Sequence, residues 1–240
     1  FEAAIVKHDV KVFIHCNPHN PVGHVWTEDE MDQLFSICKR HSVLIISDEI
    51  HQDLVAGPLP FTSALTVSNG AYANNIIAMS SLSKSFNMAS LHHAEVIIPN
   101  EDLRRQYNAC KSLMYHTDSD VIAETAITAA YTHPEAEIWL TDLLNLVKEN
   151  YEYMCSQLLQ ALPKLRISPM DGTYLVWIDF GAYVKAEDMH NIFENQCGIA
   201  PSFGEWFGGK SYATFVRLNL ATSLENIKIA TNSMIQHIHP

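Results

Sequence analysis

The sequence predicts an α/β protein with a mainly parallel sheet in a large domain, followed by a smaller α/β domain. In the first hundred residues, short uninterrupted apolar runs alternate with a helical segment, as is typical of parallel strands covered on both faces. A helical block follows from 101 to 162, and strand and helix patterns alternate again after 166. With 240 residues and 48% apolar side chains, the chain can bury a sizeable core, which excludes a disordered chain or a small disulfide scaffold.

The first three expected elements form a strand–helix–strand unit. The apolar run Val10–Ile14 predicts a strand, and a loop with two prolines and a glycine ends it. Thr27 followed by Glu30 has the spacing of a capping box, and apolar residues then recur at helical intervals, so we expect a helix over Thr27–His41. The β-branched run Val43–Ile46 predicts the second strand, buried in a parallel sheet.

The remaining elements follow from the same two periodicities. We expect strands over Ile76–Met79 and Val96–Ile98, helices over Glu101–His116, Ser119–Thr132 and Glu135–Leu162, a strand over Thr173–Phe180, a helix over Ala186–Cys197, a strand over Phe215–Leu220 and a closing helix over Leu224–His237. Pro163 ends the helical block, so we expect the large domain to cover residues 1–162 and the small domain residues 163–240.

Charge and cysteine usage restrict the partners and the compartment. The chain has 15 Lys+Arg against 27 Asp+Glu, a net charge of −12, and no basic block, which argues against a nucleic-acid or anionic-membrane surface. No apolar run is long enough to span a bilayer. Five scattered cysteines without a C-x-x-C pair suit reduced thiols. We therefore expect a cytoplasmic protein that needs a local cation for any acidic ligand.

Candidate functional residues follow the strands. Ligands of open parallel sheets bind beyond the carboxyl ends of the strands, so the residues just after each strand are the ones to inspect. An amide, an anion, two hydroxyls and an amine stand at these places. The residues concerned are Asn20 after the first strand, Asp48, Ile50 and His51 after the second, and Ser81, Ser83 and Lys84 after the third.

This set of groups suits pyridoxal phosphate held through a lysine Schiff base. An ionised Asp48 would keep the pyridine nitrogen protonated, because a nearby opposite charge favours the charged form. Lys84 would bind the aldehyde and then act as general base on the substrate Cα proton. Ser81 and Ser83 can donate to phosphate oxygens. Singly, a lysine in a serine-rich loop is usually a surface residue and an Asp-Glu pair is usually a helix cap; their joint order along the chain favours the cofactor.

Three strings in the sequence resemble those of a known family. They are CNPHNPVG at 16–23, SDEIHQDL at 47–54 and SLSKSFN at 81–87. They are similar to fold-type I pyridoxal-phosphate enzymes, most closely the cystathionine β-lyases (C–S lyases) grouped with class I and II aminotransferases. The resemblance extends over essentially all 240 residues, and it implies the fold of that family's large domain plus the small C-terminal domain.

The resemblance implies a role for each candidate residue. Asn20 would hydrogen-bond the cofactor's phenolic oxygen, Asp48 would pair with the pyridine nitrogen, and Lys84 would be the covalent attachment point. Ile50 would lie against one face of the ring, and His51 stands where many aminotransferases have a tyrosine near the phenolic oxygen.

Outside the cofactor site, Arg217 on the predicted strand Phe215–Leu220 matches the arginine that binds the substrate α-carboxylate, a planar anion suited to a guanidinium. The resemblance also implies a homodimer and a family N-terminal part preceding Phe1.

The function implied is a C–S β-lyase that releases thiol, pyruvate and ammonia from cystathionine or cysteine-type amino acids. His92 stands eight residues after Lys84, where many aminotransferases have a phosphate-binding arginine; this departure favours the lyase branch. An aminotransferase is the first alternative, and a truncated non-catalytic chain or a protein-docking module is the second. No metal site is expected, because His15 and His19 straddle a strand end and lack a third ligand.

Overall fold

The computed structural model describes residues 1–116 and 120–239. These residues form two compact units, each described here by itself. The first unit comprises Phe1–Pro18, Val25–Val55 and Leu59–Leu140. The second comprises His19–His24, Ala56–Pro58 and the chain from Thr141 onward. Within the described part of the chain, no helix combines the length and apolarity that a bilayer span needs.

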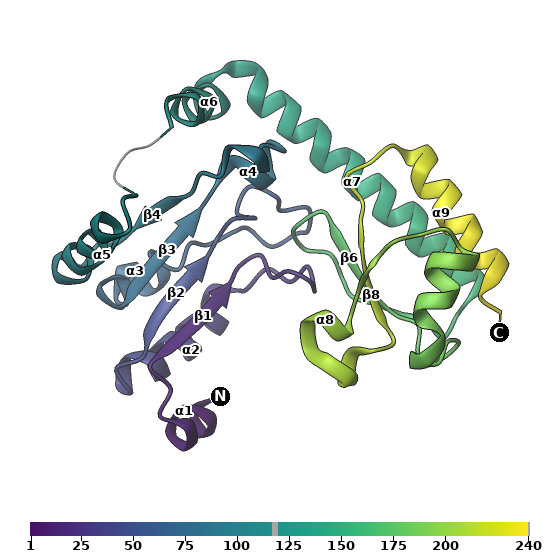
Figure 1. Cartoon of the computed structure of the whole chain (residues 1–240), viewed down its shortest axis with the longest axis horizontal. Helices are drawn as coiled ribbons and strands as arrows, with labels where there is room; N and C mark the ends of the chain where they lie inside the picture. Colours follow the sequence, from purple (N-terminus) through teal and green to yellow (C-terminus); the bar gives the residue numbers. More distant parts are fainter. Residues whose placement is uncertain (117–119, 240) are drawn as a thin grey trace. The chain divides into compact units, whose positions relative to one another are not determined.

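A four-stranded, mainly parallel sheet forms the centre of the first unit (Figure 1). The strands lie side by side in the order β1 (Val12–Cys16), β2 (Leu44–Asp48), β3 (Ile76–Ser80) and β4 (Glu95–Ile97). The pairs β1·β2 and β2·β3 are parallel, and β4 runs antiparallel to β3. The α/β fold class and the mainly parallel sheet are thereby confirmed.

Helix α2 (Glu28–Arg40) follows β1 and completes the predicted strand–helix–strand unit. The Thr27 side chain accepts a hydrogen bond from the Glu30 backbone N–H, and the Glu30 carboxylate accepts one from the Thr27 backbone N–H, so the capping box is present. Met31, Phe35 and Cys38, spaced at helical intervals, are fully buried in the core of this unit.

Strand β1 begins two residues later than predicted. A short helix, α1 (Glu2–His8), precedes it and was not predicted. Asp9 closes α1 in a left-handed conformation, and the Val10 backbone N–H donates to the Ile5 carbonyl, so Val10 belongs to the end of the helix. The strand can therefore start only after this turn.

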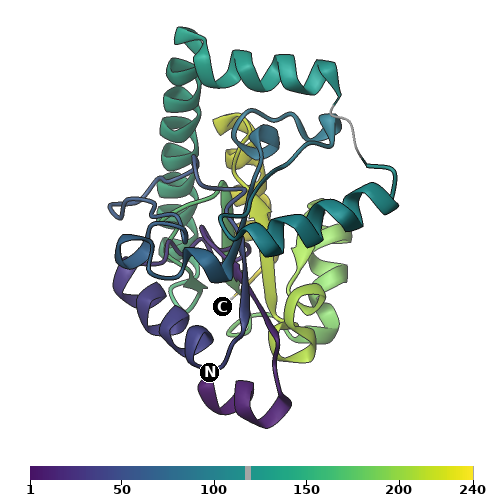
Figure 2. The ribbon, with the colours of Figure 1, turned by 90° about the vertical axis from the view of Figure 1, so that its left-hand side faces the viewer.

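The helices of the first unit flank and extend the sheet. They are α3 (Val67–Gly70), α4 (Leu82–Ser85), α5 (Glu101–Leu113), α6 (Val121–Thr132) and the first turns of α7 (Pro134–Ala161). Figure 2 shows α6 lying across the start of α7, and Pro134 is the first residue of α7 at that bend. Ser119, where we predicted α6 to begin, lies outside the described residues.

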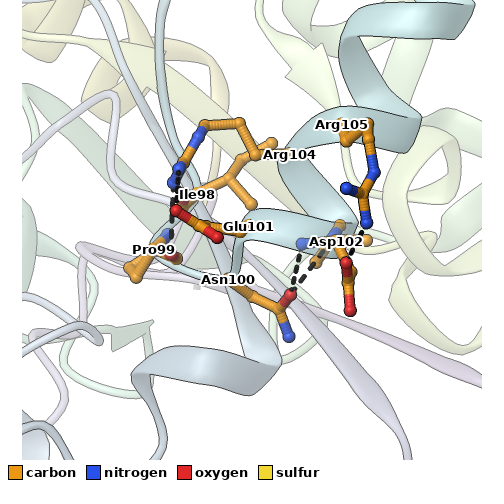
Figure 3. Close-up of polar contacts among 8 residues, drawn as sticks. Ile98, Pro99, Asn100, Glu101, Asp102, Arg104 and Arg105 are labelled. Carbon is orange, nitrogen blue, oxygen red and sulfur yellow. Dashed lines mark hydrogen bonds and ion pairs between the residues drawn. The ribbon is translucent and has the colours of Figure 1, made fainter.

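Helix α5 shows how side chains fix a helix start (Figure 3). Asn100 caps the helix by accepting from the backbone N–H groups of Asp102 and Leu103. Arg104 reaches back to donate to the carbonyl of Ile98 at 2.7 Å, and Arg105 pairs with Asp102. These contacts tie α5 to the segment that follows β4.

An antiparallel sheet organises the second unit. Its order is β5 (Arg166–Ile167), β6 (Leu175–Asp179), β8 (Phe215–Asn219) and β7 (Ser202–Phe203). All five residues of β6 are buried, and α9 (Leu224–His237), with the predicted bounds, packs onto the same core. The compact units divide between Leu140 and Thr141 inside α7, whereas the domain boundary at 162/163 stays a prediction.

The predicted helix over Ala186–Cys197 is wrong as a continuous α-helix. The segment holds a 3₁₀ turn at Ala186–Asp188 and a π-helix at Asn191–Gln196. The Cys197 backbone N–H donates to the carbonyl of Ile192, five residues earlier, at 2.8 Å. Apolar periodicity places buried residues such as Phe193 but does not distinguish among helix types.

Candidate active site

The carboxyl ends of β2 and β3 meet at one edge of the first unit's sheet. Asp48, the last residue of β2, is the register partner of Met79 in β3. The Glu49 backbone N–H also donates to the Met79 carbonyl at 2.8 Å, which continues the pairing beyond β2. Lys84 lies in α4, immediately after β3, so the carboxylate and the amine singled out from the sequence follow neighbouring parallel strands at the same edge.

Lys84 is carried by a helix of a single turn. Ser81 caps α4: its hydroxyl accepts from the Ser83 backbone N–H at 3.1 Å and donates to the His93 carbonyl at 2.6 Å. Leu82, 1% exposed, buries one side of the turn. Lys84 itself is half-buried, and its amine makes no hydrogen bond or ion pair with any residue that the structure describes.

Asp48 is likewise left open to a ligand. One of its carboxylate oxygens, Oδ1, accepts from the Ile50 backbone N–H at 3.2 Å. No cationic side chain pairs with it among the described residues. A half-buried carboxylate with an available oxygen can therefore pair with a cation brought by a bound molecule.

The neighbouring carboxylate, Glu49, is fixed from several sides. It is 4% exposed and accepts from the hydroxyls of Ser47 and Ser63 at 2.9 and 2.8 Å and from the Ala64 N–H at 2.9 Å. Burial raises the pKa of the Glu49 carboxyl against these hydrogen bonds. This group holds the 63–64 segment to the end of β2.

A tight turn follows Asp48 and positions the next candidates. The Leu54 backbone N–H donates to the His51 carbonyl at 2.9 Å, and His51 is buried while Ile50 is half-buried. Asp53, in the same turn, accepts from the Ser85 hydroxyl at 2.7 Å. It also accepts from the Tyr131 hydroxyl at 3.2 Å.

Asn20 and Arg217 lie together in the second unit. The Arg217 guanidinium donates from Nη1 to Asn20 Oδ1 at 2.8 Å and from Nη2 to Ser202 Oγ at 2.9 Å, and its carbon lies 4.8 Å from the centroid of Phe207. Burial lowers the pKa of Arg217, an effect opposed by Tyr174. Two hydrogen bonds and a ring therefore orient this cation on β8.

The loop that carries Asn20 is tied to the second unit by Gly23. The Gly23 carbonyl accepts from the backbone N–H groups of Asp171 and Gly172, both at 2.9 Å. Gly23 has φ +81°, and a Cβ there would lie 3.3 Å from the Met170 backbone, so only glycine suits this turn.

The structure thus brings six sequence-predicted residues together in the first unit and two in the second. The first set is Asp48, Ile50, His51, Ser81, Ser83 and Lys84, and the second is Asn20 and Arg217. Sequence reasoning missed the residues that hold Lys84 and Arg217 in place. These are Asp53, Ser85, Tyr131, Ser202 and Phe207. Asp53 stands inside the motif at 47–54, which is the one signal that could have found it.

Comparisons with known proteins identify relatives along the whole chain. The family model for class I and II aminotransferases matches residues 1–234. The cystathionine beta-lyase PatB of Bacillus subtilis is 30% identical over 230 residues, which is 95% of this chain and 58% of that protein. Protein MalY of Escherichia coli is 37% identical over 239 residues, 99% of this chain and 60% of that protein.

A solved structure gives the same result for the fold. The PLP-bound C-S lyase from Staphylococcus hominis superposes with a TM-score of 0.89 at 29% identity, over 98% of this chain and 60% of that one. The chain therefore spans about three fifths of the length of the relatives it matches.

Proposed function

The chain belongs to the class I and II aminotransferase family, and from this premise we propose that it binds pyridoxal phosphate as part of a C–S β-lyase. The substrates would be cystathionine and cysteine-type amino acids. One observation carries the proposal: Lys84, with no partner among the described residues, and Asp48, with no cationic partner among them, follow neighbouring parallel strands at one sheet edge. The names of PatB and of the Staphylococcus hominis lyase support the reaction type.

The donor set of the first unit fits the cofactor. The Lys84 amine is available for covalent attachment to the aldehyde, and Asp48 for the pyridine nitrogen. The Ser83 hydroxyl has no partner among the described residues and can donate to the phosphate, whereas the Ser81 proton is already given to the His93 carbonyl. Ile50 and His51 would border the ring from the turn after Asp48.

The second unit supplies groups that suit the substrate. Arg217 uses two of its five N–H donors on Asn20 and Ser202, which leaves three for a planar carboxylate. Asn20 accepts from Arg217 through Oδ1, so its amide N–H groups stay available for the cofactor's phenolic oxygen. The Arg217 guanidinium is oriented before any ligand arrives, which lowers the entropy cost of binding.

The residues of this chain then move one proton. When bound, pyridoxal phosphate supplies an electron sink for the substrate carbanion. Lys84 Nζ takes the proton from the substrate Cα, and Asp48 stabilises the protonated pyridine nitrogen during this step. In a β-lyase the thiolate leaves from Cβ, and the products are thiol, pyruvate and ammonia.

An aminotransferase is the second candidate, favoured by the family model that matches the chain. It would use the same Lys84, Asp48 and Arg217 and would differ only in where the proton goes after it leaves Cα. Loss of a thiolate from Cβ gives the lyase, and return of the proton to the cofactor carbon gives the transaminase.

The test uses the full-length protein that contains this chain, loaded with pyridoxal phosphate. We expect a band at about 420 nm, pyruvate release from L-cystathionine, and loss of both in Lys84→Ala. Amino-group exchange with a 2-oxo acid and no pyruvate would replace the lyase with the transaminase. A colourless protein whose behaviour is unchanged by Lys84→Ala would favour the non-catalytic or docking alternative.

Assembly and compartment complete the proposal. We infer a cytoplasmic homodimer that uses no nucleic-acid or membrane surface. All five cysteines are free thiols, in keeping with a reducing compartment. Large apolar side chains are exposed around the ends of α5 and α6, Leu113 at 80%, Tyr115 at 93% and Val121 at 74%, which is more than a monomer usually exposes in one region. Analytical ultracentrifugation of the full-length protein would test the dimer.

A further inference from the structure

Asp53 connects three segments of the first unit through one carboxylate. Its Oδ2 atom accepts from the hydroxyl of Ser85 at 2.7 Å and from the hydroxyl of Tyr131 at 3.2 Å. Ser85 is the last residue of α4 and is fully buried, and Tyr131 lies near the end of α6. A carboxylate that accepts two hydroxyl hydrogen bonds, one of them from a buried residue, is a strong tether.

The helix that carries Lys84 needs such a tether. A single isolated turn has no stability of its own, so α4 is held by what binds its ends. Its start is fixed by the Ser81 cap and by the burial of Leu82. Its end is fixed by Ser85, whose hydroxyl donates to Asp53. Lys84 is the residue directly before that anchor.

The same carboxylate belongs to the turn that starts at Asp48. Within this turn the backbone N–H of Gln52 donates to the Glu49 carbonyl at 2.9 Å, so Asp53 is rigidly joined to the end of β2. The bond from Ser85 to Asp53 therefore links the segment of the candidate carboxylate to the helix of the candidate amine.

Tyr131 adds a third support. Its ring lies edge-on to Phe86, 5.8 Å between centroids, and Phe86 stacks on Trp139. Burial, followed by the nearby Asp53 charge, raises the pKa of Tyr131, so the hydroxyl keeps its proton and remains a donor. The aromatic contacts hold the residue that follows Ser85.

We propose that Asp53 is a positioning residue that, through Ser85 and Tyr131, sets the place of the Lys84 amine relative to Asp48. This inference rests on the proposed function in assigning the cofactor to Lys84. Asp53 touches neither cofactor nor substrate in this account, and it acts through α4.

The chain offers a matched control in Asp32. This carboxylate also accepts from a serine and a tyrosine, Ser68 and Tyr72, but it lies on α2, away from α4. Asp53→Ala and Asp32→Ala therefore remove the same kind of network at two places. Asp53→Asn keeps an acceptor for Ser85 and tests whether the hydrogen bond suffices without the charge, and Ser85→Ala removes the bond from the other side.

The first readout needs no cofactor and uses the full chain. The acetylation rate of Lys84 by a small amine reagent, measured by mass spectrometry against Lys39 as internal reference, reports how α4 holds the amine. We expect Asp53→Ala and Ser85→Ala each to raise this rate about tenfold, Asp53→Asn to restore most of the difference, and Asp32→Ala to leave it unchanged. The double variant Asp53→Ala/Ser85→Ala should match the larger single effect, because both remove one bond.

The second readout is the affinity of the full-length protein for pyridoxal phosphate, followed by its absorbance. We expect Asp53→Ala to weaken it about tenfold and Asp32→Ala to have no effect. Unchanged Lys84 acetylation in folded Asp53→Ala or Asp53→Asn, or an equal change in Asp32→Ala, would overturn the positioning role. Should Asp53→Ala not fold, Ser85→Ala and Asp53→Asn decide the same question. Acetylation rates that change as expected without any absorbance from bound cofactor would leave the positioning role intact and overturn the proposed function instead.

Discussion

The two charged groups that matter most are held in opposite ways. Lys84, in the first unit, is half-buried and its amine has no partner among the described residues, while the helix beneath it is tethered at both ends. Arg217, in the second unit, has its own guanidinium held by Asn20, Ser202 and the Phe207 ring. A group that must form and break a covalent bond needs freedom at its tip, whereas a group that only binds an anion gains from a fixed orientation.

Removing the amine gives the largest effect expected from this contrast. Lys84→Ala should lower kcat of the full-length protein by at least about 10³-fold, because attachment and proton transfer are both lost. Its free energy of unfolding should change by no more than about 0.5 kcal/mol, since the amine has no partner to lose among the described residues. Steady-state kinetics and urea unfolding measure the two quantities.

Lys39→Ala serves as the control in the same unit. Lys39 donates to the Ala71 carbonyl at 3.1 Å and lies on α2. We expect it to leave kcat unchanged. Comparable losses of activity in both variants would remove the special role of Lys84.

Replacing the oriented cation tests the other half of the contrast. Arg217→Lys keeps the charge but cannot bond Asn20, Ser202 and a carboxylate at once, so KM for the amino acid should rise about 30-fold, equivalent to about 2 kcal/mol. Arg166→Lys changes an arginine of the same sheet that pairs with Asp179, and it should leave KM unchanged. A KM insensitive to Arg217→Lys would show that charge alone binds the substrate.

Removing one holder of Arg217 should have a smaller effect. Ser202→Ala deletes the bond to Nη2 and leaves the bond to Asn20, so KM should rise about fivefold with kcat little changed, since one hydrogen bond contributes about 1 kcal/mol. Ser233→Ala removes a serine hydroxyl of the same unit that donates to the Cys197 carbonyl, and it should leave KM alone. Equal KM values in the two variants would mean that Arg217 needs no fixed orientation.

The sequence predicted the ends of the strands better than the contacts beyond them. Apolar runs and the Thr27 capping box located β2, β3 and α2, and the rule for parallel sheets then placed Asp48 and Lys84 at one edge. The bonds from Ser85 to Asp53 and from Arg217 to Asn20 join residues 32 and 197 positions apart. No local periodicity encodes such pairs, because they depend on how loops fold back onto the sheet.

The π-helix at Asn191–Gln196 escaped prediction for a different reason. Phe193 is buried and contacts Phe180 and Phe203, so the apolar pattern of a helix is present. The pattern reports which side chains are buried and not whether the backbone bonds span four or five residues.

Within the first unit, the adjacent carboxylates Asp48 and Glu49 repeat the contrast between an available and a fixed group, and Glu49 yields the smallest expected effect. Its pKa is raised above the model value of 4.5 by burial, so the folded chain holds more protons than the unfolded chain above that pH. The contribution of Glu49 to stability therefore falls as pH rises from 4.5 through the raised folded pKa and then levels off.

Glu49→Gln removes this titration and keeps the hydrogen bonds, because Oε1 still accepts from Ser47 and Ala64 and the amide can donate to Ser63. The variant should gain stability relative to the parent as pH increases above 4.5, by at most about 1 kcal/mol at neutral pH. Urea unfolding of both proteins across this range measures the difference. A difference that is constant with pH would mean that Glu49 ionises in the folded chain as it does in the unfolded one, and that the three hydrogen bonds fully offset its burial.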